Sequence, residues 1–255
     1  MAEIAVAATA PFGADVLERL AATNEVVQLL TRPDAPRGRG RKLAPSAAKA
    51  TAERLGIPVV HDRDELAADT VVVAAYGLLI PDSALERALW LNVHPSLLPR
   101  WRGAAPVERA LMAGDAQTGV TIHRTTKELD AGPIAAQEAF PVAPDDDAGA
   151  VFARAAEVAA RLVDGVLPNP SFTPQPEEGV TYAEKIGAAD RELDLSRPPQ
   201  ELVNRVRALS PHIGARMDDL IVWKARVDDG TFVPVEVQPP GGRRMDYDAY
   251  LRGRR

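Results

Sequence analysis

Three polar side chains, drawn from two places in the sequence, could act together on a carbonyl group. Asn92 and His94 end the strand-like stretch LWLNVH, and Asp130 lies in ELDAG. Because strand side chains alternate between faces, Asn92 and His94 project on the same side. An amide N–H beside an imidazole can meet a developing oxyanion, and the imidazole can also move a proton. Asp130 can fix the tautomer and charge of that imidazole.

Each of these residues also has a plain structural interpretation. Asp130 could be an ordinary turn residue, and a strand-end histidine could make only a local hydrogen bond. His61, His123 and His212 are predicted to be structural. The sequence has no G-x-S-x-G elbow, no G-x-G-x-x-G before a helix and no His/Asp/Glu cluster with metal-ligand spacing. We therefore expect no serine triad, no dinucleotide site and no metal.

The elements that hold these residues alternate along the chain. Strands are predicted at 3–9, 25–31, 58–61, 69–77, 89–94, 119–126 and 140–144, and helices at 11–23, 46–57, 81–88, 107–115 and 147–167. This alternation predicts a doubly wound α/β domain with a mainly parallel sheet over residues 1–165. Ligands of such sheets bind beyond the carboxyl ends of the strands, where Asn92 and His94 stand.

The sequence of the remaining third of the chain predicts a linker followed by a small C-terminal region. Residues 166–190 include the proline-rich stretch PNPSFTPQPEEG and are expected to be a linker. Residues 191–255 should contain a helix from Pro199 and two strands, 220–227 and 232–238, that could pair as a hairpin. So short a region cannot build a rich core of its own.

Composition narrows the class of protein. The 255 residues are 46% hydrophobic, include no cysteine and carry a net charge of −6. Disulfides and cysteine nucleophiles are excluded, and neither a signal peptide nor a membrane-length apolar stretch is visible, so we expect a cytoplasmic protein. Arginine and lysine cluster at 32–42 and arginine at 243–255. Such clusters either attract a polyanion or form solvated surface.

Longer motifs resemble one family. NVHPSLLPRWRGAAPVERALMAGDAQTGVTIHRTTKELDAG is similar to the central block of methionyl-tRNA formyltransferases, and N-x-H-x-S-L-L-P and L-D-x-G are shared by the wider family that uses 10-formyltetrahydrofolate. RPDAPRGRGRKLAP resembles the basic loop of the tRNA enzymes, and AAYGLLIP resembles their folate-pocket strand. TYAEKI, RALSPHIGA and IVWKARV extend the resemblance over nearly the whole chain. PRWRGAAP and the basic loop are specific to the tRNA branch.

The resemblance implies a function and a set of sites. A formyl group would pass from 10-formyltetrahydrofolate to the α-amine of methionyl initiator tRNA, giving formylmethionyl-tRNA for translation initiation. The reaction would need no metal. We expect the protein to be a monomer. Asn92 and His94 would stabilise the oxyanion, and Asp130 would hold His94. The implied folate contacts are Ala75, Tyr76, Gly77, Leu78, Ile80, Ser96, Leu97, Leu98 and Pro99. The implied tRNA contacts are Arg37, Arg39, Arg41 and Lys42. Arg100 and Arg102 are equally compatible with packing around Trp101 and with an RNA contact.

Two departures from the family pattern leave alternatives open. The stretch at 8–12 reads Ala-Thr-Ala-Pro-Phe where the family usually has Gly-Thr-Pro-x-Phe. The family ends in an OB-like barrel, whereas few residues follow Val227, so we expect a truncated OB-like appendage and no closed barrel. The alternatives are a formyltransferase for another amine, such as a nucleotide-linked amino sugar, a formyltetrahydrofolate hydrolase, and a non-catalytic folate- or RNA-binding protein.

Overall fold

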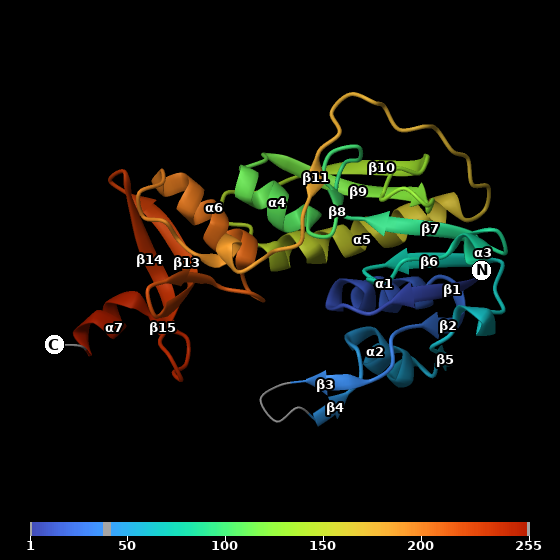
Figure 1. Ribbon diagram of the computed structural model, residues 1–255, viewed down its shortest axis with the longest axis horizontal. Helices are drawn as coiled ribbons and strands as arrows, with labels where there is room; N and C mark the ends of the chain where they lie inside the picture. The colour runs from blue at the N-terminus through green and yellow to red at the C-terminus, as the bar shows by residue number, and fades with distance from the viewer. Residues whose placement is uncertain (1, 38–41, 254–255) are drawn as a thin grey trace. The chain divides into compact units, whose positions relative to one another are not determined.

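A computed structural model describes residues 2–37 and 42–253 of the chain (Figure 1). Contacts between residues divide it into two compact units. The first comprises residues 1–102, 119–139 and 153–180, and the second comprises residues 103–118, 140–152 and 181–255. Each unit has its own sheet and is described by itself.

The first unit is built on a seven-stranded sheet in the order β10-β9-β7-β6-β1-β2-β5. The strands are β1 (Glu3–Ala8), β2 (Glu25–Leu30), β5 (Val59–Val60), β6 (Thr70–Ala74), β7 (Leu89–His94), β9 (Gln117–Arg124) and β10 (Ile134–Pro141). The five strands from β5 to β7 pair in parallel, and β9 runs antiparallel to β7. The predicted α/β class and the mainly parallel sheet are confirmed.

Buried apolar runs explain why the central strands form. Every residue of β1 after Glu3 is buried, as is every residue of β6 after Thr70, which is the pattern of a parallel sheet covered on both faces. The helices and short 3-10 turn of this part of the chain are α1 (Pro11–Ala21), α2 (Ala47–Leu55), η1 (Arg63–Glu65), α3 (Asp82–Leu85) and α5 (Ala148–Val166). α1 packs very closely on the sheet, because a Cβ on Gly13 would lie 2.2 Å from the carbonyl oxygen of Ala74.

Local sequence signals set the ends of these helices. Pro11 occupies the first turn of α1, where its missing N–H costs nothing. Ser46 caps α2 by accepting a hydrogen bond from the Lys49 amide at 3.0 Å, and Gly56 ends that helix with φ of 71°. The predicted boundaries of α1, α2 and α5 agree with the structure to within about two residues, whereas α3 ends three residues before its predicted end.

The basic run is partly a hairpin rather than only a loop. β3 (Ala35–Arg37) pairs antiparallel with β4 (Lys42–Ala44). The residues between them, 38–41, lie outside the described part of the chain. Of the implied tRNA contacts, Arg37 and Lys42 are therefore in the hairpin strands, while Arg39 and Arg41 fall in the undescribed segment.

The second unit contains a four-stranded antiparallel sheet and helices. The sheet order is β12 (Ala215–Met217), β13 (Leu220–Asp228), β14 (Thr231–Gln238) and β15 (Met245–Asp246). Its helices are α4 (Pro106–Ala113), α6 (Pro199–Leu209) and α7 (Tyr247–Arg252), with the short elements β8 (Arg102–Gly103), β11 (Tyr182–Ala183) and η2 (Ala189–Arg191). Leu202, Val206 and Leu209 of α6 pack with Leu220 and Val222 of β13 in a buried cluster.

The predicted helix from Pro199 and the predicted hairpin are confirmed by α6 and by the β13–β14 pair. The short strands β12 and β15 were not predicted, because two or three residues are too few to show an alternating pattern. Among the strands that the structure describes here, β12 and β15 are the two edges of this sheet and do not pair with each other, so the sheet is open. Extra antiparallel strands at the C-terminal end of the chain thus agree with the expected appendage.

Candidate active site

β7 delivers Asn92 and His94 to the carboxyl edge of the first unit's sheet. Asn92 lies beside Val73 of β6 on one side and opposite His123 of β9 on the other, and His94 lies opposite Thr121. The strand alternation predicted that Asn92 and His94 share a face. Both side chains contact the Asp130 carboxylate, which confirms that they lie on the same side of β7.

The Asn92 amide is held by two acceptors. Its Nδ2 lies 3.0 Å from Nε2 of His123 and 3.1 Å from Oδ1 of Asp130. His123 Nδ1 lies 3.1 Å from the carbonyl oxygen of Arg124, so Nδ1 carries the ring proton and Nε2 is the acceptor. Because both partners accept, the amide must point its nitrogen at them. In this state the two N–H groups of Asn92 face His123 and Asp130.

His94 is buried and its tautomer is fixed. Its Nε2 donates to the carbonyl oxygen of Trp101 at 2.8 Å, and Nδ1 faces Oδ2 of Asp130 at 3.6 Å. Only 4% of the residue is exposed. Burial lowers the pKa of His94 below its ordinary value, and the Asp130 carboxylate opposes this shift in part. A neutral ring of this tautomer presents an unprotonated Nδ1 to the carboxylate, ready to receive a proton.

Asp130 takes a backbone conformation that is uncommon for its residue type. Its φ is 46°, in the left-handed region that aspartate tolerates better than most side chains. The turn also approaches β9 closely, since a Cβ on Gly132 would lie 1.8 Å from the carbonyl oxygen of Arg124. Only glycine fits at position 132 without a shift of the backbone. The predicted turn is present, and its aspartate points to the two β7 residues.

The Ser96–Pro99 segment is fixed by β9 and β10. Thr121 Oγ1 donates to the carbonyl oxygen of Ser96 at 2.7 Å and accepts from the Leu98 amide at 3.1 Å. Gln137 Nε2 donates to the Leu98 carbonyl at 3.0 Å. The Ser96 hydroxyl donates to the carbonyl of Arg100 at 2.6 Å, and the Ser96 and Leu98 side chains are buried. Any ligand role of these two residues must therefore use their backbone.

The segment after β6 is open to solvent at its leucines. Ala75 and Gly77 both have positive φ, and Arg32 donates a hydrogen bond to the carbonyl of Gly77. Tyr76 is buried, whereas Leu78 is 44% exposed and the neighbouring Leu79 is 85% exposed. Ile80 is partly buried against the core. Two exposed leucines at the carboxyl edge of a sheet can contact a flat apolar ligand.

Arg100 and Arg102, for which the sequence left two interpretations open, both have partners within the protein. The Arg100 guanidinium lies 4.3 Å from the centre of the Trp101 ring. Arg102 donates through Nε and an Nη atom to Oε1 of Gln175, at 3.1 and 2.6 Å. These contacts favour the packing interpretation of both residues over an RNA contact.

His123 and Gln175 belong to this region but were not predicted as site residues. His123 was assigned a structural role, yet it is 1% exposed and contacts both Asn92 and Asp130. The alternation that places Asn92 on one face could not show that position 123 of the neighbouring strand lies opposite it. Gln175 was expected in a linker, and no sequence pattern marks it.

Two searches of the described residues gave no result. Within residues 2–37 and 42–253, no three His, Cys, Asp or Glu side chains are grouped so as to hold a metal ion. In the same residues, no helix combines the length and the apolar character needed to cross a membrane.

Comparison with known proteins identifies the class. Residues 2–167 match the family described as formyl transferase. The methionyl-tRNA formyltransferase of Dechloromonas aromatica (strain RCB) is 39% identical over 290 residues, covering 97% of this chain and 94% of that protein. The chain therefore belongs to the formyl transferase family. Its curated relatives include a second enzyme of that name, from Halorhodospira halophila, which is 37% identical and covers 100% of this chain and 97% of its own length.

Solved structures share the fold. The methionyl-tRNA formyltransferase of Clostridium thermocellum superposes with a TM-score of 0.68 at 14% identity, over 96% of this chain and all of that one. An N-formyltransferase from Helicobacter canadensis, in complex with folinic acid and dTDP-3-aminofucose, gives a TM-score of 0.71 at 17% identity, over 90% of this chain and 89% of that one. At these identities the likeness is one of fold and does not choose between amine acceptors.

Proposed function

We propose that this chain transfers the formyl group of 10-formyltetrahydrofolate to the α-amine of methionyl initiator tRNA. The observation that carries the proposal is the set of Asn92, His94 and Asp130, which meet at one edge of the sheet within 3.1 to 3.6 Å. Near-complete coverage of relatives named methionyl-tRNA formyltransferase supports this acceptor over an amino sugar.

The residues around this edge fit the donor. The donor supplies a formyl group that is already attached to nitrogen and therefore activated toward amines. Leu78, exposed beside β6, gives an apolar contact for a ring system, as does its neighbour Leu79. The fixed backbone of Ser96–Pro99 offers peptide groups at constant positions. We assign donor contact to these two segments, including Ala75, Tyr76, Gly77 and Ile80.

His94 and Asp130 together handle the proton. As the amine nitrogen bonds to the formyl carbon, it must lose a proton. His94 Nδ1 has no ring proton in the neutral state and faces the Asp130 carboxylate, so the pair can accept that proton and hold it as an ion pair. The pair returns it when the donor nitrogen departs, which leaves the tetrahydrofolate amine and the formylated aminoacyl-tRNA.

Asn92 supplies a neutral donor for the formyl oxygen. Both of its N–H groups face acceptors in the described state, so one of them must turn from Asp130 to the oxygen as negative charge develops there. Protonation of the His94–Asp130 pair weakens the hold of Asp130 on Asn92 at the moment when the charge appears. We propose that the two events are linked through this shared carboxylate.

The basic hairpin is assigned to the tRNA. Lys42 is exposed at the start of β4, and Arg37 ends β3. Together with Arg39 and Arg41 of the intervening segment, they give this stretch of sequence four positive charges, which an RNA phosphate backbone attracts. Contact between this group and the acceptor end of methionyl-tRNA remains part of the proposal.

The test is a formyl-transfer assay with competing acceptors. Purified protein is given 10-formyltetrahydrofolate with methionyl initiator tRNA, with a nucleotide-linked amino sugar, or with neither, and free formate is followed in each case. We expect formylmethionyl-tRNA from the wild type and almost none from His94→Ala. Preferential formylation of the sugar, or formate release that methionyl-tRNA does not suppress, would replace the proposal with one of the alternatives.

A further inference from the structure

The segment after α5 returns along the first unit's sheet and contacts the turn that carries Asp130. Thr173 forms an antiparallel bridge with Ile134, through two backbone hydrogen bonds of 2.8 and 2.9 Å. Two residues later, Gln175 Nε2 donates to the carbonyl oxygen of Asp130 at 2.7 Å and to that of Gly132 at 2.8 Å. Residues 153–180 cluster with the first unit by their contacts. This part of the predicted linker is thus packed against the sheet.

Arg102 orients the Gln175 amide. It donates twice to Oε1, so the oxygen faces the guanidinium and the nitrogen must face the two carbonyls. The assignment of oxygen and nitrogen needs no assumption, because each neighbour can play only one role. Arg102 thus orients Gln175, and Gln175 holds the carbonyl groups of Asp130 and Gly132, the residues on either side of Ala131.

The turn needs such support because of its geometry. Asp130 has a positive φ, which a non-glycine residue keeps only where surrounding contacts favour it. Its carboxylate must reach Nδ2 of Asn92 and Nδ1 of His94 together, at 3.1 and 3.6 Å. A small change in this turn moves the carboxylate away from one partner or the other.

We infer that Gln175 is a positioning residue that, held by Arg102, sets the Asp130 turn so that its carboxylate meets Asn92 and His94. This inference rests on the proposed function for its kinetic consequences. Loss of the clamp should slow the proton step without weakening the binding of either substrate, because Gln175 acts only on the backbone of the turn. Misplacement of a catalytic group by about 1 Å can cost about 100-fold in rate.

Three variants separate the clamp from general stability. Gln175→Leu removes both hydrogen-bonding roles. Gln175→Glu keeps an acceptor for Arg102 but cannot donate to the two carbonyls. Gln200→Leu is the matched control, since Gln200 is an exposed amide on α6 that donates to Asn204 at 3.1 Å. Thermal unfolding of each protein verifies that it is folded at the assay temperature.

The kinetic result should distinguish the variants clearly. We expect kcat for formylmethionyl-tRNA formation to fall about 30-fold in Gln175→Leu and in Gln175→Glu, with KM for both substrates within about twofold of wild type. Gln200→Leu should match the wild type. Wild-type kcat in either Gln175 variant, or a loss that appears only in KM, overturns the inference. An inactive wild type would instead count against the proposed function.

A second readout needs no activity. The chain has four histidines, so the ring resonances of His94 can be followed by NMR with His61 and His212 as exposed references. Burial lowers the pKa of His94, and the Asp130 carboxylate raises it in part. When the Asp130 turn is released in Gln175→Leu, the carboxylate moves away from Nδ1 and the pKa of His94 should fall further. An unchanged His94 titration in a folded variant contradicts the inference.

Discussion

The two sheets of this chain differ in how their residues are buried. β1 and β6 of the seven-stranded sheet are buried at nearly every position, so their backbones are fixed from both faces. β13 of the four-stranded sheet is buried over its first half and exposed over its second half. α6 covers one face of this second sheet through Leu202, Val206 and Leu209. The seven-stranded sheet thus holds Asn92 and His94 in one geometry, whereas the four-stranded sheet leaves part of its surface exposed to solvent and to binding partners.

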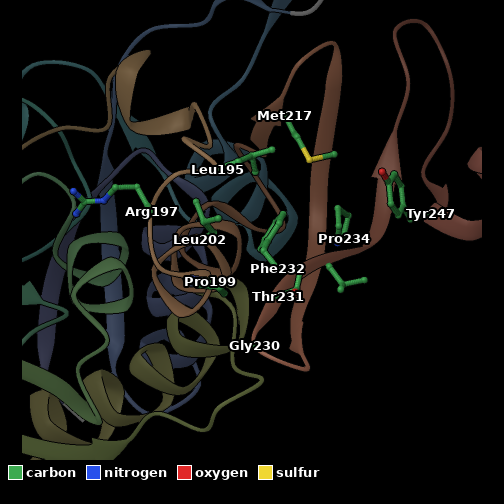
Figure 2. A pocket seen from close by; sticks show the side chains of 11 residues that line it. Leu195, Arg197, Pro199, Leu202, Met217, Gly230, Thr231, Phe232, Pro234 and Tyr247 are labelled. Carbon is green, nitrogen blue, oxygen red and sulfur yellow. The ribbon is translucent and has the colours of Figure 1, made fainter.

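The accessible surface of the second sheet includes a hollow of about 520 Å³ beside α6. Figure 2 shows Leu202 of α6 and Phe232 of β14 near one another, with Leu195 and Met217 beside them. The hollow is open and mostly apolar, unlike the hydrogen-bonded edge that carries His94. The comparison predicts that substitutions at the edge carrying His94, proposed to be catalytic, change kcat, and that substitutions on the second unit change substrate affinity or stability.

The largest expected effect is at the proposed catalytic residues His94 and Asp130. His94→Ala and Asp130→Asn should each lower kcat by about 1,000-fold, because each removes one partner of the proton-accepting pair. Steady-state formylation assays measure the loss. His61→Ala serves as the control, since His61 is exposed and its Nδ1 contacts the carbonyl oxygen of Thr31 at 2.9 Å. An activity loss of similar size in His61→Ala would show that His94 and Asp130 have no special role in the reaction.

A smaller effect on kcat is expected at His123, because this residue holds the Asn92 amide and is not proposed to contact the substrate. His123→Leu removes the acceptor of one Asn92 N–H and leaves that amide free to rotate. We expect kcat to fall about tenfold, and the free energy of unfolding to fall by about 1 kcal/mol, because a partly buried N–H of Asn92 loses its partner. Urea unfolding and kinetics measure the two changes. If His123→Leu behaved like exposed His212→Leu, then His123 would have only the structural role that the sequence suggested.

The burial of His94 also predicts a pH dependence of stability. The pKa of His94 is lowered in the folded chain, so below pH 6.5, its ordinary value, the unfolded chain binds more protons than the folded one. Stability from this group is fully present above pH 6.5 and is lost as the pH falls toward the folded-state pKa, by at most about 1.4 kcal/mol per pH unit. Urea unfolding at several pH values should show this loss, and His94→Gln should reduce it. An unchanged slope in that variant would contradict the assignment.

The smallest expected effect concerns the C-terminal arginines of the second unit, where we expect a change in substrate affinity and not in kcat. Arg243 and Arg252 are exposed, whereas Arg244 is held over the Trp223 ring at 3.6 Å. Arg243→Ala with Arg252→Ala should raise KM for methionyl-tRNA a few-fold at unchanged kcat. The slope of log affinity against log salt should become shallower by about two, because phosphate contacts release counterions. An unchanged salt slope would show that these arginines do not contact tRNA phosphates and are only solvated surface.

Much of the fold could be predicted because the signals were local. Buried apolar runs mark β1 and β6, and Ser46, Gly56 and Pro11 mark helix ends. The strand period also places Asn92 and His94 on one side. Short strands such as β12 and β15 carry too few residues for any period to show. The hairpin of the basic run was missed for the same reason.

The remaining parts of the site depend on contacts between distant positions. His123 meets Asn92 only because β9 pairs with β7 in one register, and sequence alone does not give that register. Gln175 lies 45 positions from Asp130 in the chain, within a proline-rich stretch that indicates only a linker. No local pattern distinguishes a glutamine that clamps a turn from one that is solvated. Such residues become visible only when the backbone brings them together.

The most direct test of the account is a single-turnover reaction with wild-type protein in excess over 10-formyltetrahydrofolate, with and without methionyl initiator tRNA. We predict that the formyl group appears on the methionine when the tRNA is present, that little formate is released in its absence, and that Asp130→Asn slows the transfer about 1,000-fold. Formate release at the same rate with and without the tRNA, or a wild-type rate in Asp130→Asn, would contradict the account.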